Sequence, residues 1–355
     1  LYGEVSPYSA TRLERFAACA FAHFLQYGMK LTERVEYEFK PMDMGNVMHE
    51  ALESFAEEVR KRGMKWTELT EQERNEIADR CLDNIVADYG NTVLKSSARN
   101  EYMIERTRRI LRRTVWALQK QLEQGEFQPE GFEVTFGGGR IDRVDIMEDQ
   151  NKVYVKVIDY KTGNTSFDLV YLYHGLQLQL MIYLDGALRV EQKKYPDKEI
   201  IPAGVFYYNI KDPMIQEKID ADVEAVSAGL MKELKMNGLV QADPELVYRM
   251  DSSLGSIPVS FNKDGNFRKN SSVADRTQFA VLGRYVRTKI EKIRSSILEG
   301  DAEVSPYELG KKNACTYCPY MTVCGFDRRL SGYEFRRLKN FSDEELWKAF
   351  DREAE

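Results

Sequence analysis

The chain has 355 residues, of which 43% are hydrophobic and 30% are charged, and its formal net charge is −6. This is the composition of an ordinary globular protein with a sizeable core. The negative charge argues against a protein that binds nucleic acid by bulk charge, so any DNA contact must be local. No apolar stretch approaches the roughly 20 residues that span a bilayer, and no signal peptide is recognisable, so we expect no membrane contact and a cytoplasmic protein.

A first amphipathic helix is predicted from Thr11. Apolar residues recur at spacings of three and four between Leu13 and Phe24, which is the period of a helix with one buried face. Thr11 and Glu14 have the spacing of a capping box at its start.

A second helix is predicted after Gly45, and charged helical sequence continues to about Gln128. This second helix carries His49, one of only three histidines in the chain. A lone histidine on a helix is more often a satisfied core residue than a metal ligand. The sequence around His49 therefore leaves both interpretations open.

The next part of the chain has the pattern of a sheet with a helix packed on it. After Pro129, β-type sequence is interrupted by short polar turns. A helical pattern follows from Asp168 to Leu188. The predicted strands are Phe132–Phe136, Gly139–Met147, Lys152–Tyr160 and Ile201–Ile210. Together with the helical first third, they indicate a helix-wrapped sheet of α/β type.

The remaining sequence is predicted to contain fewer strands. The stretch from Asp212 to Ser272 mixes one helical segment with a polar, Gly- and Ser-containing loop or small hairpin. A helix is predicted from about Val273 to Leu298, and the charged tail has a helical pattern.

Two aspartates and a lysine stand on strands that otherwise have core patterns. Asp142 shares the alternation of Val144, and Asp159 with Lys161 continues the alternation of Val157. A carboxylate on an apolar face is costly unless it is paired or bound to a metal. One interpretation is a structural Asp–Lys ion pair at the sheet edge. The other is a divalent cation shared by Asp142 and Asp159, with Lys161 orienting water and stabilising charge on a phosphate.

Gln179 and Tyr183 are four residues apart and therefore neighbours on one face of the predicted helix. A tyrosine in such a stripe is usually a core residue. A glutamine in the same stripe is harder to explain, because a buried amide needs hydrogen-bond partners.

Three of the five cysteines are close together, at Cys315, Cys318 and Cys324, and Cys19 is the candidate for a fourth ligand. In a cytoplasmic protein this pattern favours metal binding over disulfides. Zinc and a cubane iron–sulfur cluster both accept four thiolates, and the spacing does not separate them.

These motifs together resemble a known family. Their order along the chain is similar to that of the RecB-like PD-(D/E)XK iron–sulfur nucleases. The motifs are, in order, Cys19, the His49 helix, the strand Gly139–Asp142 (GRID), the strand Asp159–Lys161 (DYK), the Gln179–Tyr183 helix and a late CxxCxxxxxC. Among these nucleases, the chain resembles most the C-terminal nuclease domain of the B subunits of bacterial AddAB helicase/nucleases. The segments that carry this likeness are Val205–Pro213 (VFYYNIKDP) and Ser305–Gly310 (SPYELG).

The resemblance implies a PD-(D/E)XK restriction-endonuclease-like core, with a mixed central sheet flanked by helices and a large helical N-terminal region. Residues 1–355 would form one nuclease domain. Its parts would be helices at 1–128, catalytic strands and helix at 129–211, loop and helices at 212–300, and the cysteine cluster and tail at 301–355.

The resemblance also implies roles for individual residues. His49, Asp142 and Asp159 would bind Mg²⁺ or Mn²⁺, and Lys161 would be the catalytic lysine. Gln179 and Tyr183 would line the DNA-side wall, and Glu133 matches a supporting acidic position less securely. The cysteines Cys19, Cys315, Cys318 and Cys324 would hold a [4Fe-4S] cluster that joins the N- and C-terminal segments, and Cys81 would be a spare core thiol.

The implied activity is hydrolysis of single-stranded DNA ends during double-strand break resection and recombinational repair. The chain has no GxxxxGK[ST] loop, so it lacks a P-loop motor of its own. It also begins without methionine. We therefore expect the nuclease end of a larger subunit that works with an AddA-type partner. The alternatives are a stand-alone CRISPR-adaptation-type iron–sulfur nuclease and a catalytically silent DNA-binding scaffold.

Overall fold

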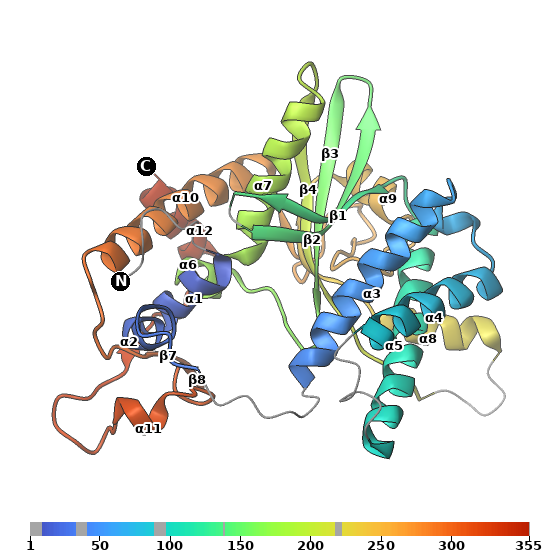
Figure 1. Ribbon diagram of the computed structural model, residues 1–355. Coiled ribbons are helices and arrows are strands. Elements are labelled where there is room, and N and C mark those ends of the chain that lie inside the picture. Colours follow the sequence, from blue (N-terminus) through green and yellow to red (C-terminus); the bar gives the residue numbers. More distant parts are fainter. Residues whose placement is uncertain (1–8, 33–40, 89–96, 138, 217–221, 355) are drawn as a thin grey trace.

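A six-stranded mixed sheet forms the centre of the computed structural model, which describes residues 9–32, 41–88, 97–137, 139–216 and 222–354 (Figure 1). The strand order follows the chain from β1 to β6. Strands β1, β2 and β3 form an antiparallel meander, β4 is parallel to β3, β5 is antiparallel to β4, and β6 is parallel to β5. The strands are β1 (Gln128–Phe136), β2 (Gly139–Asp149), β3 (Lys152–Lys161), β4 (Glu199–Asn209), β5 (Asn237–Gln241) and β6 (Val273–Ala274).

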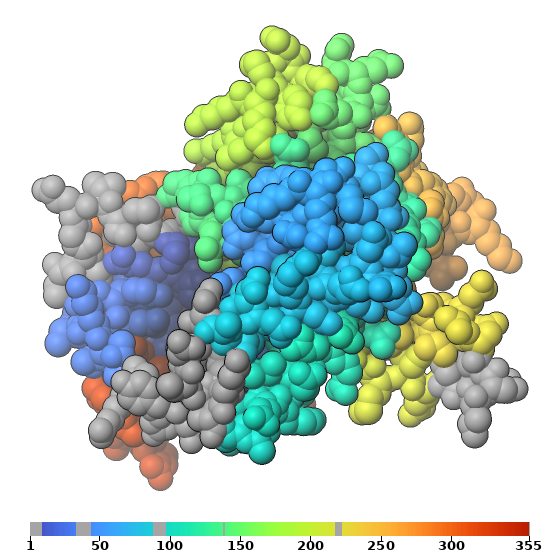
Figure 2. Space-filling view, turned by 45° about the vertical axis from the view of Figure 1, so that its right-hand side comes forward, coloured from blue at the N-terminus to red at the C-terminus, as the bar shows by residue number. Residues whose placement is uncertain are grey.

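Helices α3, α4, α5 and α9 cover one face of the sheet. Phe55 and Leu111 are fully buried in this layer, where they meet Ile158 and Phe206 of the strands. In the space-filling view, α3 and α4 lie across this side of the molecule in light blue and cyan (Figure 2). The bounds are α3 (Pro41–Lys61), α4 (Glu71–Asp88), α5 (Ala98–Glu123) and α9 (Pro244–Met250), with a 3₁₀ turn at Trp66–Glu68 and α8 (Val223–Glu233).

The other face carries a second core, made with α1, α6, α7, α10 and α12. Leu180 and Leu184 of α7 pack there against Val155 and Val157 of β3, so the central strands are buried on both sides. The bounds are α1 (Ala10–Ala18), α6 (Leu169–Tyr173), α7 (Gln179–Lys194), α10 (Arg276–Leu298) and α12 (Asp343–Ala354). None of the helices in the described ranges is long and apolar enough to cross a membrane.

An early segment and a late segment of the chain meet in a small third unit. Helix α2 and the π-helical turn after it lie beside the late strands β7 and β8 and helix α11 (Figure 1). The backbone N–H of Phe21 donates to Glu303 O at 3.0 Å. The elements are α2 (Ala20–His23), the turn Phe24–Gly28, β7 (Tyr307–Leu309), β8 (Lys312–Asn313), α11 (Met321–Cys324) and β9 (Arg336–Arg337).

The predicted α/β class, the flanking helices and the helical first third are confirmed. Some details of the predicted elements were wrong. The single helix predicted from Asp168 to Leu188 is broken between α6 and α7, where Gly175 has a φ of 79°, a conformation that glycine adopts without strain. Strand β5 was missed in the stretch from Asp212 to Ser272, where only a helical segment and a loop or hairpin were predicted. The residues Val273–Ala274, predicted to begin a helix, form strand β6, and the helix begins at Arg276.

Candidate active site

The strands β2 and β3 bring Asp142 to the backbone of Tyr160. A carboxylate oxygen of Asp142, Oδ2, accepts a hydrogen bond from the Tyr160 N–H at 2.7 Å. The regular alternation expected for Asp142 is interrupted here, because Ile141 and Val144 pack in the same core. Asp142 is 9% exposed and Asp159 is 1% exposed, so both carboxyl groups are largely shielded from water.

Helix α3, in the helical layer that covers one face of the sheet, places His49 beside this carboxylate. The ring nitrogen Nδ1 lies 3.4 Å from Oδ2 of Asp142, and the His49 side chain keeps 30% of its exposure. Its neighbour Met48 is 1% exposed and supplies the core packing. His49 is therefore not a satisfied core residue. Burial opposes its charge, but the neighbouring carboxylates prevail, and the pKa of His49 is raised.

Glu133 belongs to the same group of side chains. Its neighbours Phe132 and Val134 pair with Arg143 and Ile141, which sets Glu133 opposite Asp142. Like charges directly opposite each other on paired strands are unfavourable without a cation between them. Glu133 also has a φ of 49°, an unusual backbone conformation for a residue other than glycine, and such conformations cluster at functional sites.

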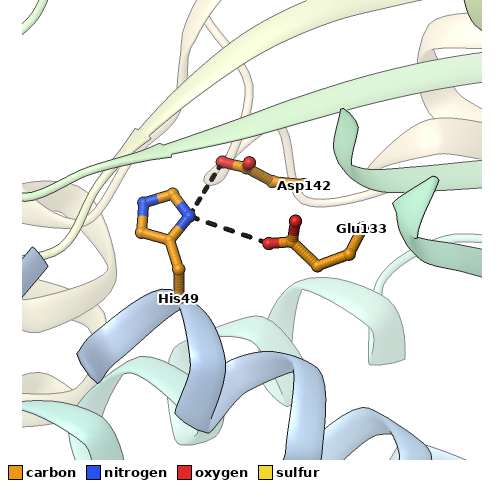
Figure 3. A group of neighbouring side chains, drawn as sticks. All are labelled: His49, Glu133 and Asp142. Carbon is orange, nitrogen blue, oxygen red and sulfur yellow. Dashed lines mark ion pairs between the residues drawn. The ribbon is translucent and has the colours of Figure 1, made fainter. Parts of the chain in front are cut away.

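His49, Glu133 and Asp142 converge as a set of possible metal ligands (Figure 3). One ligand atom from each lies within 4.8 Å of the other two, and Nδ1 of His49 is 4.0 Å from Oε1 of Glu133. Burial and the charge of Asp142 raise the pKa of Glu133 to about 7, although Arg140 forms an ion pair with it. Carboxylate oxygens and imidazole nitrogen suit Mg²⁺ or Mn²⁺, so these donors fit a divalent ion.

Asp159 and Lys161 form the adjoining half of the site at the end of β3. Their ion pair is 2.7 Å long, so the contact expected under the structural interpretation is present. Strand β3 is internal to the sheet, however, and not at its edge. Burial and the charge of Asp142 raise the pKa of Asp159 despite the Lys161 ammonium. One lysine therefore does not balance the carboxylates gathered here.

Helix α7 holds the other side of Lys161. The ammonium donates to Oε1 of Gln179 at 2.7 Å, and Nε2 of Gln179 donates to the Tyr183 hydroxyl at 2.9 Å. Gln179 thus has the partners that a buried amide requires. The Tyr183 ring is 8% exposed and packs edge-on against Phe136. Its ring is therefore a core element, and its contact with DNA stays a prediction.

A cavity of about 600 Å³ opens beside the His49 group. Its three glutamates outnumber its basic residues, Arg140 and His49, so a cation or a metal-bound phosphate is a better occupant than a free anion. The lining residues are Gly45, Asn46, His49, Glu50, Glu53, Glu133, Arg140 and Thr162.

The four cysteines named from the sequence meet around a second, much smaller cavity of about 20 Å³. Cys19 reaches it from the end of α1, and Cys315, Cys318 and Cys324 from the late segment. Burial, together with the other three sulfurs, raises the pKa of Cys315 to about 11, so this thiol is protonated near neutral pH unless a metal binds it. Cys81 lies apart in the α3–α5 core, where burial raises its thiol pKa to about 11.

A guanidinium group approaches this cysteine centre. Nη2 of Arg15 lies 3.9 Å from Sγ of Cys318. A cation beside the sulfur can balance the negative charge of a metal-bound thiolate. The donor set, with four soft sulfur ligands and an adjacent positive charge, fits zinc or an iron–sulfur cluster.

Comparison with known proteins gives one consistent result. Residues 7–325 match the PD-(D/E)XK nuclease superfamily. The whole chain is 43% identical to the B subunit of an ATP-dependent helicase/deoxyribonuclease from Lachnoclostridium phytofermentans and 36% identical to the one from Thermoanaerobacter sp. strain X514. The chain covers 32% and 33% of these relatives, so it spans about a third of their length.

Proposed function

The chain belongs to the PD-(D/E)XK nuclease superfamily, and we propose that it is the nuclease module of a helicase/deoxyribonuclease B subunit. In this proposal it hydrolyses phosphodiester bonds of single-stranded DNA ends in double-strand break resection and recombinational repair. The observation that carries the proposal is the convergence of His49, Glu133 and Asp142 beside the Asp159–Lys161 pair.

Nucleases of this superfamily use divalent metals, and the acidic group here supplies suitable ligands. His49, Asp142 and Asp159 would hold Mg²⁺ or Mn²⁺, and Glu133 would complete or support the set. When bound, the ion would neutralise the gathered carboxylates and would supply Lewis-acid chemistry for the scissile phosphate and for water. The deprotonated carboxylates would be its ligands, so the raised pKa values of Glu133 and Asp159 describe the protein without the ion.

Lys161 has the geometry of a group that positions water and stabilises charge. Its ammonium is held by Asp159 at 2.7 Å and Gln179 at 2.7 Å, and 27% of its side chain is exposed. It can therefore face a substrate while its position stays fixed. In hydrolysis, the water oxygen bonds to phosphorus, the P–O bond to the leaving nucleotide breaks, and one water proton ends on the leaving oxygen. The lysine stabilises negative charge on the phosphate.

The names and lengths of the relatives support the proposed substrate and partner. Those proteins are named helicase/deoxyribonuclease subunits and are about three times as long as this chain. Their length does not favour the stand-alone CRISPR-adaptation type. A helicase-bearing AddA-type subunit would deliver the strand, which suits a module whose net charge is −6. A cytoplasmic location is part of the same proposal.

For the cysteine centre we propose a [4Fe-4S] cluster held by Cys19, Cys315, Cys318 and Cys324. Bound there, it would supply a cross-link between the N-terminal helix and the late segment. All four cysteines line the same small cavity, and the resemblance of the chain to iron–sulfur nucleases favours the cluster over zinc.

Metal dependence is the test of this function. The chain, purified anaerobically, is incubated with end-labelled single-stranded DNA after removal of divalent ions, and Mg²⁺ or Mn²⁺ is then returned. We expect cleavage only after metal is returned, and none by Asp159→Ala. Metal-independent cleavage, or full activity of Asp159→Ala, would refute the proposal. Absence of cleavage with strong DNA binding would support the silent scaffold.

A further inference from the structure

Glu14 contacts the start of α7 from a distant part of the chain. One of its carboxylate oxygens, Oε1, accepts hydrogen bonds from the backbone N–H groups of Leu178 at 2.7 Å and Gln179 at 3.0 Å. Leu178 is the N-cap residue of α7 and offers no side-chain cap of its own. The first N–H groups of a helix have no partner within the helix. Glu14 therefore provides the missing cap from α1.

This contact corrects the role expected for Glu14 from the sequence. The N-cap of α1 is Ser9, whose hydroxyl accepts the Arg12 N–H at 3.3 Å, so Thr11 and Glu14 do not form a capping box. Glu14 is thereby available to α7. A negative group at a helix N-terminus also interacts favourably with the helix dipole.

The residue that Glu14 holds is the one that holds Lys161. The backbone of Gln179 donates to Glu14, and its side-chain oxygen accepts from the Lys161 ammonium at 2.7 Å. Only the side chain of Gln179 separates the two charged groups. Burial raises the pKa of Glu14 to about 7, against the two N–H groups and the Lys161 charge, which lower it. Glu14 and Lys161 therefore interact electrostatically as well as through the hydrogen bonds of Gln179.

We propose that Glu14 is a positioning residue of the nuclease site, which fixes the first turn of α7 so that Gln179 keeps Lys161 beside Asp159. The inference rests on the proposed function and assigns Glu14 a part in it without contact to substrate or metal. Helix α1 ends at Cys19, whose N–H donates to Arg15 O at 3.1 Å. The helix that carries Glu14 is thus anchored at its other end in the cysteine centre.

The experiment compares Glu14→Ala and Glu14→Gln with a control, Asp243→Ala. Asp243 also accepts two backbone N–H groups, from Glu245 at 3.0 Å and Leu246 at 3.3 Å, but at the start of α9. The readouts are amide hydrogen exchange across residues 176–184, Mn²⁺ affinity, and kcat and KM for cleavage of single-stranded DNA. The glutamine variant keeps an oxygen that can accept both bonds, so it separates the hydrogen bonds from the charge.

Glu14→Ala should lose protection at the Leu178 and Gln179 amides and lower kcat about tenfold, with KM and Mn²⁺ affinity little changed. Glu14→Gln should keep the protection and stay within about threefold of the wild-type kcat. Asp243→Ala should change exchange only near α9. Wild-type exchange and kcat in Glu14→Ala would overturn the inference, as would an equal loss in Asp243→Ala. If the wild type does not cleave, the proposed function fails, while exchange at residues 178 and 179 still decides whether Glu14 holds α7.

Discussion

Glu133 and Asp142 lie opposite each other on the paired strands β1 and β2, and Nδ1 of His49 is within 4.0 Å of a carboxylate oxygen of each. Two desolvated carboxylates in this relation repel each other. The repulsion is removed if a cation lies between them. Binding of a divalent ion is therefore expected to depend on both residues.

Glu133→Gln should weaken Mn²⁺ binding by about tenfold or more, because the amide is neutral and the site loses one hard anionic ligand. Titration calorimetry on the metal-free protein measures the change. Glu130→Gln is a matched control, since Glu130 lies on the same strand and pairs with Lys194 at 2.9 Å, outside the lining of the active-site cavity. Equal affinities of Glu133→Gln and the wild type would remove Glu133 from the metal site.

The metal-free protein should become less stable as pH rises. Glu133 has a pKa of about 7 in the folded chain against an ordinary value of 4.5, so the folded state binds more protons between these values. Stability contributed by a raised pKa is present at low pH and lost as pH rises through the folded pKa. His49, with its raised pKa, acts in the same direction.

Urea denaturation at about pH 5 and about pH 7.5 checks this expectation. The free energy of unfolding should fall between the two pH values in the absence of metal, fall less in Glu133→Gln, and recover when Mg²⁺ is added. A stability that increases over this range, or that does not respond to Mg²⁺, would contradict the assignment of the carboxylates.

Cysteine replacements should divide into two classes. Cys19→Ala removes a proposed ligand that joins the two ends of the chain, so the loss of stability should be on the order of several kcal/mol. Cys81→Ala removes only a core thiol and should be milder. Thermal denaturation measures both, and iron analysis with visible absorbance identifies the centre. Equal melting temperatures would contradict the role of Cys19, and a colourless protein with stoichiometric zinc would replace the iron–sulfur cluster by zinc.

The buried charges around Asp145 have a structural role, unlike those of the active site. Asp145 is fully buried and pairs with Arg143 at 2.5 Å and Lys156 at 2.9 Å. Asp145→Asn leaves two buried cations poorly balanced, so it should cost about 3–5 kcal/mol of stability. Mn²⁺ affinity per folded molecule should be unchanged. Asp149→Asn, at the exposed end of the same strand, is the control in urea denaturation, and a metal affinity that falls with Asp145→Asn would place Asp145 in the active site.

The sequence was sufficient for most of the architecture, because periodicity reports which faces are buried. The meander and the flanking helices were predictable in this way. So was the placement of His49 on a helix and of Asp142, Asp159 and Lys161 on strands. The approach of Cys19 to the late cysteines was predictable because three closely spaced thiols leave one ligand position open.

Other features depend on tertiary contacts that no local pattern encodes. Glu133 joins the His49 group through strand register and an unusual φ of 49°, and neither has a signal in its neighbouring residues. The partner of Glu14 is 164 residues away, so its local spacing suggested a capping box within its own helix. The pairing of Asp145 with Lys156 likewise requires the register of β2 against β3.

The most direct test of the account is single-turnover cleavage of a single-stranded oligonucleotide by Lys161→Ala, with Lys152→Ala as control. Lys152 begins the same strand at its exposed end, whereas Lys161 ends it beside Asp159. We predict that Lys161→Ala abolishes Mg²⁺-dependent cleavage while the fold and the cysteine centre remain intact, and that Lys152→Ala cleaves like the wild type. Full activity of Lys161→Ala would contradict the account.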